Sequence, residues 1–522
     1  MLQNNSISML EKLSINNEGM PKSFLASIGS NKLEGLKNGL LNLFPRTETY
    51  QLLDFDDFQI GFNGIHKTNF YFFDQQTELA FFVIGSVRNL DAVFNSSKLG
   101  VSFTDAEKIA LLYGKLGISF AKLLFGAFAV IIFNESKKEL QVLTDTTGQM
   151  PIYFVKNGEE LFLTSELKVF SNRDLFPIKL IEQKKFLDFA NHASKYCFLA
   201  GFEKIIAGTV YTFNYYEAKI KIQHKSFSEI KISENKTDFE ESLMLIYTNL
   251  MAQVLSGINK NKRIGIPLSG GLDSGIIAAM AKKEVKNLQS FTIGTELGNE
   301  FDQAREAATF LGTKHTEIFI DNDGFMDSVL HGIYLNEFAH PVYAEGYPGF
   351  YHIFKKAHNE IDTYITGYGA DLILGDIYNL EDKSTINKIS EHACHHTQWT
   401  GEFSPFIAGH FNAEIIHPFW NLDLINMAIS LPWHYKYKGE EVKFILREMA
   451  VRKKLLPKDY AWRKKTAFNV GSSTDKLLAK MLQIEDYKDY ESKGKFLYKV
   501  LQYLFVDGNK LDQLDYKSLL KK

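Results

Sequence analysis

The chain has 522 residues, with 59 Lys and Arg against 62 Asp and Glu, a formal net charge of −3, and 45% hydrophobic residues. The near-neutral charge argues against nucleic acid and anionic membrane surfaces as partners, and no segment reaches the ~18 consecutive apolar residues of a membrane span. The low count of two cysteines and the lack of a signal-like N-terminal segment predict a cytoplasmic protein. The length predicts two domains, and association into a homo-oligomer is possible.

Residues 1–228 are expected to form the first domain, built mainly of strands. Short apolar and aromatic runs between residues 50 and 100 predict the first of these strands. Thr104 and Glu107 have the spacing of a capping box and predict the start of a helix. The apolar runs that follow are separated by short polar turns, which predicts two successive hairpins. Their strands are expected at 127–133 with 140–144 and at 152–155 with 161–164.

The charged stretch 218–236 is interpreted as the linker region before a second domain, 235–522. Beyond a periodic helix at 239–255, strand-like runs alternate with helical segments. This alternation predicts a parallel sheet, whose ligands collect at the carboxyl ends of the strands. Residues 384–505 are predicted to be mostly helical. The parallel strands are expected at 264–268, 288–293, 316–320 and 362–366.

Two loops at the ends of these strands carry chemically useful residues. Residues 269–274, SGGLDS, turn sharply at a pair of glycines directly before a helix, so that backbone N–H groups and the helix N-terminus can face a polyanion. A capped turn without a ligand is the alternative explanation. Residues 366–371, TGYGAD, follow a later strand and could place Asp371 beside Asp273. Two carboxylates facing one polyphosphate suit magnesium.

Segments of the second half resemble, in the same order, the asparagine synthetase class of ATP-dependent enzymes. They are 264–273, 293–301, 366–371, 399–403, 417–420, 445–448, 456–459 and 462–465. Within this class the chain most closely resembles the β-lactam synthetases, specifically carbapenam synthetase, because Tyr368 stands where asparagine synthetases have Glu. The resemblance implies an α/β fold: a degenerate N-terminal Ntn-glutaminase-like sandwich and a C-terminal parallel-sheet adenine-nucleotide synthetase domain with a helical C-terminal part.

The resemblance also implies roles for individual residues. Tyr368 with Glu402 would take the proton from the substrate amine, and Lys465 would stabilise the oxyanion and the departing AMP. Asp273 and Asp371 would hold Mg²⁺. The residues expected to bind ATP are Ile266, Leu268, Ser269, Gly270, Gly271, Asp273, Ser274, Ile293 and Gly367.

The reaction implied by the resemblance is ATP- and Mg²⁺-dependent closure of an amide within one small amino acid. A carboxymethylproline-like acid would give a carbapenam, with release of AMP and pyrophosphate. Glutamine-dependent relatives use an N-terminal cysteine as nucleophile. Leu2 stands at that position, so no glutamine hydrolysis is expected.

Departures from the relatives keep other interpretations open. Asn469 and Val470 replace a His-Glu pair, and Asp376 replaces a glycine. The alternatives are a ligase for another β-lactam, a lasso-peptide isopeptide cyclase, or a catalytically inactive nucleotide-binding scaffold. A group of possible metal ligands is better explained as a polar helix face, because no Glu completes a zinc-binding HExxH motif. This group comprises His392, Cys394, His395 and His396.

Overall fold

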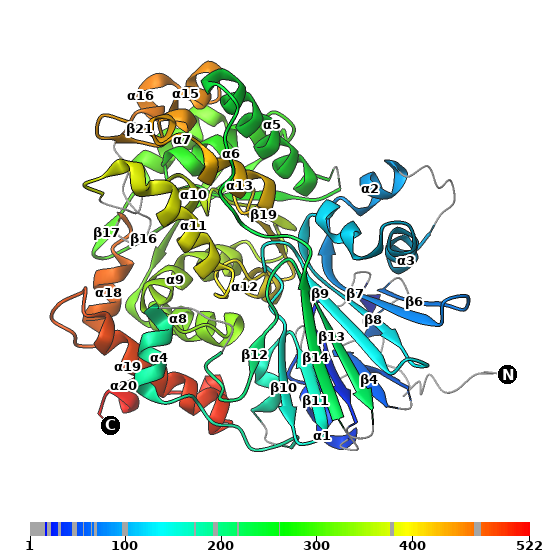
Figure 1. Cartoon of the computed structure of the whole chain (residues 1–522). Helices are drawn as coiled ribbons and strands as arrows, with labels where there is room; N and C mark the ends of the chain where they lie inside the picture. Colours follow the sequence, from blue (N-terminus) through cyan, green and yellow to red (C-terminus); the bar gives the residue numbers. More distant parts are fainter. Residues whose placement is uncertain are drawn as a thin grey trace. The chain divides into compact units, whose positions relative to one another are not determined.

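A computed structural model describes residues 16–17, 22–29, 33–43, 50–55, 57–63, 65–66, 70–96, 103–171, 174–191, 197–216, 219–259, 261–375, 380–463 and 471–521. The chain divides into two compact units (Figure 1). The first comprises Met1–Glu229, Gln398–Phe406 and Leu497–Lys522, and the second comprises Ile230–Thr397 and Ile407–Phe496. The predicted domains, 1–228 and 235–522, have nearly the same main boundary. The assignment of all later residues to one functional domain stays a prediction.

The first unit contains, among its described residues, two antiparallel sheets of six strands each. In sheet order, one consists of β12 (Glu203–Lys204), β10 (Tyr153–Asn157), β11 (Glu160–Thr164), β2 (Leu25–Ile28), β4 (Phe58–Asn63) and β3 (Tyr50–Asp54). The other consists of β14 (Lys219–Ser226), β13 (Thr209–Tyr216), β9 (Glu139–Thr144), β8 (Gly126–Asn134), β7 (Leu79–Val87) and β6 (Tyr71–Asp74).

Strand β8 shows how these sheets are held together. Successive side chains of a strand point to opposite faces, yet all nine residues of β8 are buried. Ala129, Ile131 and Phe133 belong to the core between the two sheets, where Phe58 stacks on Phe133 with ring centroids 4.6 Å apart. The alternate residues of β8 pack under helices α2 (Leu90–Ser96) and α3 (Asp105–Leu116). The sandwich is therefore covered by helices on this side.

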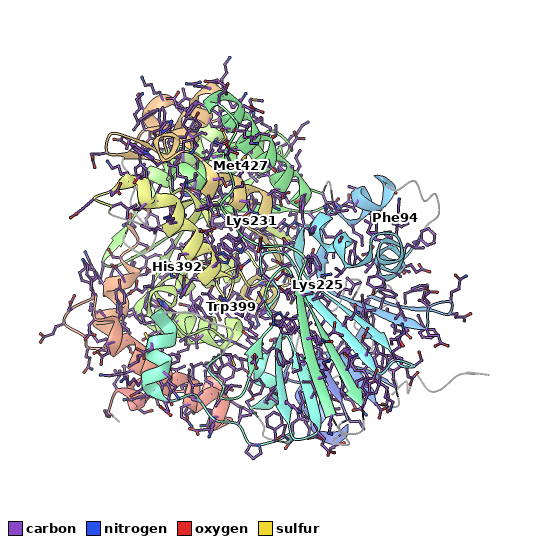
Figure 2. The ribbon with its side chains drawn as sticks, viewed as in Figure 1. Phe94, Lys225, Lys231, His392, Trp399 and Met427 are labelled. Carbon is purple, nitrogen blue, oxygen red and sulfur yellow. The ribbon has the colours of Figure 1, made fainter. Side chains whose placement is uncertain are left out.

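Most predicted elements of this unit are confirmed. Helix α3 begins with the predicted capping box, in which Glu107 N donates to Thr104 Oγ1 and Thr104 N donates to the Glu107 carboxylate. Both hairpins form, as β8 with β9 and β10 with β11. The linker interpretation of 218–236 is wrong for its first part, because β14 pairs along its whole length with β13. Its lysines, including Lys225 (Figure 2), lie on an exposed edge strand, where charge discourages further strand pairing.

The second unit is built on a parallel sheet with the order β18, β16, β15, β19, β20. Their bounds are β15 (Ile264–Pro267), β16 (Gln289–Thr295), β18 (Lys314–Ile320), β19 (Thr363–Ile365) and β20 (Glu414–Ile416). The chain adds strands on one side of β15 and then crosses to the other side, so the topological switch point lies between β15 and β19. Loops that follow these two strands face a common crevice, where ligands of such sheets bind.

The rest of the second unit is mostly helical, and its last helix, α19, continues into the first unit. The helices are α5 (Phe239–Gly257), α6 (Leu272–Lys282), α7 (Phe301–Leu311), α8 (Asn322–Asn336), α9 (Pro341–Lys356), α10 (Ala370–Leu374), α11 (Ile386–Thr397), α13 (Leu422–Ser430), α14 (Trp433–Lys436), α15 (Phe444–Arg452), α16 (Lys458–Ala461), α18 (Thr474–Met481) and α19 (Tyr490–Leu501). The predicted mixed α/β architecture, with a parallel sheet and a helical C-terminal part, is confirmed. Within the described ranges, no helix has the length and apolar character required to cross a bilayer.

Candidate active site

The glycine loop, residues 269–274, joins β15 to α6. Gly270 has φ +75°, and a Cβ there would lie 2.7 Å from the backbone carbon of Gln303, so this turn needs glycine. Gly271 N donates to Ser269 Oγ at 3.3 Å, and Tyr460 Oη donates to the Gly271 carbonyl at 3.2 Å. Gly271 is the N-cap residue of α6, and no side chain caps the helix. The alternative of a simple capped turn requires a side-chain cap, which α6 does not have. The N-terminus of α6 therefore suits an anion.

The second predicted loop, residues 366–371, lies directly against the glycine loop. A Cβ on Gly367 would be 2.5 Å from Ser274 N and 2.6 Å from the Asp273 carbonyl carbon, so the two backbones touch at this glycine. The structure thus brings Asp273 and Asp371 together, as expected for loops at a switch point.

Lys443, which the sequence analysis did not single out, connects the two loops. Its Nζ donates to Asp273 Oδ2 at 2.6 Å and also forms an ion pair with Asp371. The Lys443 side chain is 1% exposed, against 11% for Asp273 and 31% for Asp371. Lys443 directly precedes α15, and the chain separation of 170 residues from Asp273 leaves no local pattern that could have identified it.

The two carboxylates fit a divalent cation that is shared with a polyphosphate. Mg²⁺ is usually bound through one or two carboxylates together with substrate phosphates and water. Asp273 and Asp371 supply two such carboxylates, and both pair with the Lys443 ammonium. No cluster of three or more acidic, His or Cys side chains suitable for a metal occurs in the described ranges.

Tyr368 lies in the second loop among aromatic side chains. Its backbone N donates to Thr366 Oγ1 at 3.3 Å, and Thr366 Oγ1 is 2.7 Å from Nδ1 of the buried His417. The Tyr368 ring is 6.0 Å, centroid to centroid, from both the His417 and the Phe350 rings. His417 was noted in the sequence only as part of a matching segment. The structure assigns it a contact with the loop that carries Tyr368.

Other predicted site residues are not brought to this site by the described structure. Glu402 lies in Gln398–Phe406, which belongs to the first unit, so its pairing with Tyr368 stays a prediction. Lys465 lies outside the described residues, as do Asn469, Val470 and Asp376.

The described residues on either side of segment 464–470 both contact α7 or the residue that precedes it. Arg463 forms an ion pair with Glu306 of α7 at 2.7 Å, and its carbonyl accepts a hydrogen bond from Arg447 at 3.1 Å. Beyond the segment, a Cβ on Gly471 would lie 2.5 Å from Oε2 of Glu300, which immediately precedes α7. Both flanks are therefore held close to α7, the helix that also contacts Gly270 through Gln303.

The apolar residues expected at the ATP site are core residues of the sheet. Ile266 on β15 and Ile293 on β16 are at most 2% exposed, and Leu268 N donates to the Phe291 carbonyl at 2.8 Å. Their part in nucleotide binding stays a prediction. On α11, His392 (Figure 2) is exposed whereas Cys394 is fully buried, so these two possible ligands face different surroundings.

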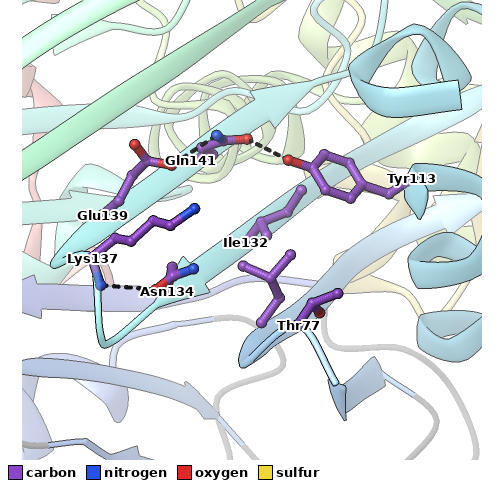
Figure 3. Close-up of a pocket in the computed structure, with 8 residues that line it drawn as sticks. Thr77, Tyr113, Ile132, Asn134, Lys137, Glu139 and Gln141 are labelled. Atoms are coloured by element: carbon purple, nitrogen blue, oxygen red, sulfur yellow. Dashed lines mark hydrogen bonds between the residues drawn. The ribbon is translucent and has the colours of Figure 1, made fainter. Parts of the chain in front are cut away.

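A cavity of about 360 Å³ in the first unit contains none of the predicted site residues (Figure 3). Its polar side chains bond to one another: Tyr113 Oη donates to Gln141 Oε1 at 3.4 Å, and Gln141 Nε2 donates to Glu139 Oε1 at 3.0 Å. Asn134 accepts a hydrogen bond from Lys137 N at 2.9 Å. The cavity therefore offers few polar groups that need a ligand.

Comparisons with protein families identify both halves of the chain. The asparagine synthase family model matches residues 249–393 and 407–504, and the glutamine amidotransferase domain model matches residues 75–225. The chain has an asparagine synthase domain. Its N-terminal part is of the Ntn-glutamine amidotransferase type, as the resemblance implied. The chain thus resembles the asparagine synthetases in both of its halves.

Two kinds of curated relative are similar to this chain. It is 23% identical over 382 residues to the carboxyethyl-arginine beta-lactam-synthase of Streptomyces clavuligerus, with coverage of 72% of this chain and 71% of the relative. It is 26% identical over 446 residues to the glutamine-hydrolyzing asparagine synthetase of Gallus gallus, with coverage of 81% and 77%. The corresponding enzyme of Rattus norvegicus is 26% identical over 434 residues, with coverage of 76% and 74%.

These findings bear on the expected source of nitrogen. The amidotransferase domain and the glutamine-hydrolyzing relatives do not fit the expectation that glutamine is not hydrolysed. The β-lactam synthase relative is compatible with either outcome. The expectation depended on Leu2 alone, and this residue lies outside the described part of the chain.

Proposed function

We propose that this protein closes a β-lactam ring within one small amino acid, using ATP and Mg²⁺. The observation that supports the ATP-dependent part of the proposal is the buried Lys443 ammonium between Asp273 and Asp371, beside the glycine loop, and Tyr368 in the second loop supports the ring-closing part. A cationic centre flanked by carboxylates at a helix N-terminus suits a polyphosphate and its divalent cation. The first-choice substrate is a carboxymethylproline-like β-amino acid, which would yield a carbapenam.

The first step activates the substrate carboxylate. A carboxylate oxygen attacks the α-phosphorus of ATP, the bond to the bridging oxygen breaks, and pyrophosphate leaves with an acyl-adenylate remaining. The N–H groups of the glycine loop and the N-terminus of α6 bind the phosphates, and Lys443 offsets negative charge on the leaving group. Mg²⁺ held by Asp273 and Asp371 would supply further charge neutralisation.

The second step closes the ring. Tyr368 accepts a proton from the substrate's own ammonium group as its hydroxyl proton passes to Glu402, and the resulting neutral amine attacks the acyl carbon. Lys465 stabilises the oxyanion that develops, and AMP leaves with the electron pair of the anhydride bond and takes up the second proton that the nitrogen loses. The product is lighter than the substrate by one water. These three roles are supported by the resemblance to β-lactam synthetases and by the chemistry that the step requires.

Incubation of the full chain with ATP, Mg²⁺ and carboxymethylproline tests the proposal. We expect AMP, pyrophosphate and a product one water lighter than the acid, in equal amounts. ATP consumption that depends on the acid but yields no cyclised product would refute ring closure. ATP binding without turnover on any acid tested would favour the alternative of a catalytically inactive scaffold.

A second substrate is favoured by one of the comparisons. The β-lactam synthase relative is described as acting on carboxyethyl-arginine. A panel that contains this acid, the proline-derived acid and precursor peptides of lasso type, scored by substrate-dependent pyrophosphate release, separates these ligase alternatives. The acid with the highest kcat/KM identifies the substrate class.

The nitrogen source can be measured separately. If the substrate's own amine is the nucleophile, ring closure proceeds without glutamine, and glutamate release from added glutamine remains at background. Because the amidotransferase domain is the finding that stands against this proposal, glutaminase activity coupled to ATP turnover would establish glutamine-dependent amidation instead.

A further inference from the structure

The segment that carries Glu402 belongs to the amidotransferase-like unit although second-unit residues flank it in the chain. Gln398–Phe406 forms part of the first unit, whereas Thr397 and Ile407 belong to the second. The asparagine synthase family model ends at residue 393 and resumes at 407, so it does not include this segment. The segment's own contacts in the first unit are therefore the ones to consider first.

Lys204, on β12 of that unit, is bonded to the backbone of this segment. Its Nζ donates to the Thr400 carbonyl at 3.0 Å and to the Gln398 carbonyl at 3.3 Å. Lys204 is only 2% exposed, and burial lowers its pKa to about 8, an effect partly opposed by Asp145 and Cys197. A buried ammonium is costly, so its hydrogen bonds must be retained for the fold to accommodate it.

Further contacts fix the segment at its two ends. Gln398 Nε2 donates to the Thr146 carbonyl at 3.4 Å, and Phe406 is buried in the core between the two sheets of the first unit. Gly148 has φ +72°, and a Cβ there would lie 3.1 Å from the Gln398 carbonyl oxygen. The backbone near residue 398 is thus closely packed against the first unit.

The turn that receives Gln398 is itself rigid. The buried Asp145 carboxylate accepts hydrogen bonds from the backbone N atoms of Thr147, Gln149 and Met150 at 2.9–3.1 Å. Within the segment, Glu402 N donates to Thr400 Oγ1 at 3.2 Å. A continuous set of bonds therefore runs from Lys204 through Thr400 to the backbone of Glu402.

We propose that Lys204 is a positioning residue for Glu402, so that the amidotransferase-like unit serves ring closure by holding this carboxylate in place. This inference rests on the proposed role of Glu402 in taking the substrate proton. Proton transfer requires hydrogen-bond distances, and an error of 1 Å in the backbone at residues 400–402 would remove the carboxylate from reach.

Separate assays of the two half-reactions test the inference on the full chain. ATP–pyrophosphate exchange with the acid reports adenylation, and product formation reports ring closure. We expect Lys204→Met to keep exchange within about twofold of wild type while product formation falls roughly tenfold or more. Lys204→Gln, which retains a neutral donor, should recover part of the loss. Lys108→Met is the matched control, because Lys108 bonds to Asp91 and Asp105 in the same unit.

A double variant, Lys204→Met with Glu402→Gln, distinguishes failure of the positioning role from failure of the proposed function. If Lys204 acts through Glu402, the double variant closes the ring no more slowly than Glu402→Gln alone. Multiplying defects, or closure unaffected by Lys204→Met while Glu402→Gln impairs it, would overturn the positioning role and leave the proposed function standing. Undiminished closure in Glu402→Gln would instead refute the proposed role of Glu402. If Lys204→Met does not fold, Thr400→Val takes its place under the same criteria.

Discussion

The most informative single change is Lys443→Met, which removes the charge between the two loops while keeping a side chain of similar length. Loss of one partner from a buried ion pair costs about 3–5 kcal/mol. Because the Asp371 side chain is 31% exposed and can be hydrated, we expect the lower end, about 3 kcal/mol. For a domain of this type that corresponds to a fall in Tm of roughly 6–12 °C. ATP–pyrophosphate exchange should be lost if, as proposed, Lys443 offsets charge on the leaving group.

The same variant offers a test with magnesium. Without Lys443, Asp273 and Asp371 repel each other, so a divalent cation should bind between them and raise the Tm of the variant more than that of wild type. Lys383→Met is the matched control, because Lys383 pairs with Glu440, whose side chain is 95% exposed, and such pairs contribute at most about 1 kcal/mol. A Tm loss no larger than that of the control, with exchange intact, would refute the role given to Lys443.

Three further changes address the loops and a buried charge. Gly367→Ala should lower exchange roughly tenfold or more, since its Cβ would collide with Ser274 N, whereas Gly346→Ala meets no atom within 4 Å and should have no effect. Tyr368→Phe should keep exchange but slow ring closure roughly a hundredfold; equal rates would exclude its hydroxyl from proton transfer. Burial lowers the pKa of Lys436 from 10.5 to about 7, so the unfolded chain binds more protons between these values and stability rises with pH. The rise is on the order of 5 kcal/mol, and Lys436→Met should raise Tm most below pH 7, with a gain that shrinks toward pH 10.

The alternation of strands and helices was sufficient to predict that the two loops meet, whereas their role as an active site stays a prediction. Residues 269–274 and 366–371 each follow a parallel strand, and the ends of such strands meet at a switch point whatever the intervening sequence is. The contact of Gly367 with Ser274 agrees with this argument. The argument from strand ends does not identify Lys443, because this residue follows no strand of the parallel sheet. Its position depends on how the later helices fold back, which local periodicity does not encode.

Charge was a poorer guide than periodicity in the region 218–236. Its lysines suggested a solvated linker, but Lys and Ile alternate over residues 219–222, the first half of β14, with the period of a strand. An edge strand needs only one neighbour and keeps its other side in solvent, so a charged composition does not argue against it. The three-residue strand β20 was missed for a different reason: so short an apolar run cannot be distinguished from part of a helix.

Glu402 shows a limit of assigning catalytic residues by domain. The resemblance pairs it with Tyr368 in one synthetase site, yet its segment is part of the amidotransferase-like unit, where Phe406 is buried in the core. Removal of residues 1–229 would leave Phe406 without that core and the Thr400 carbonyl without Lys204. The ligase half is therefore not independent of the N-terminal half, even if the latter hydrolyses no glutamine. The amidotransferase-like unit therefore has a structural part, the holding of this segment, beside any glutamine chemistry that it performs.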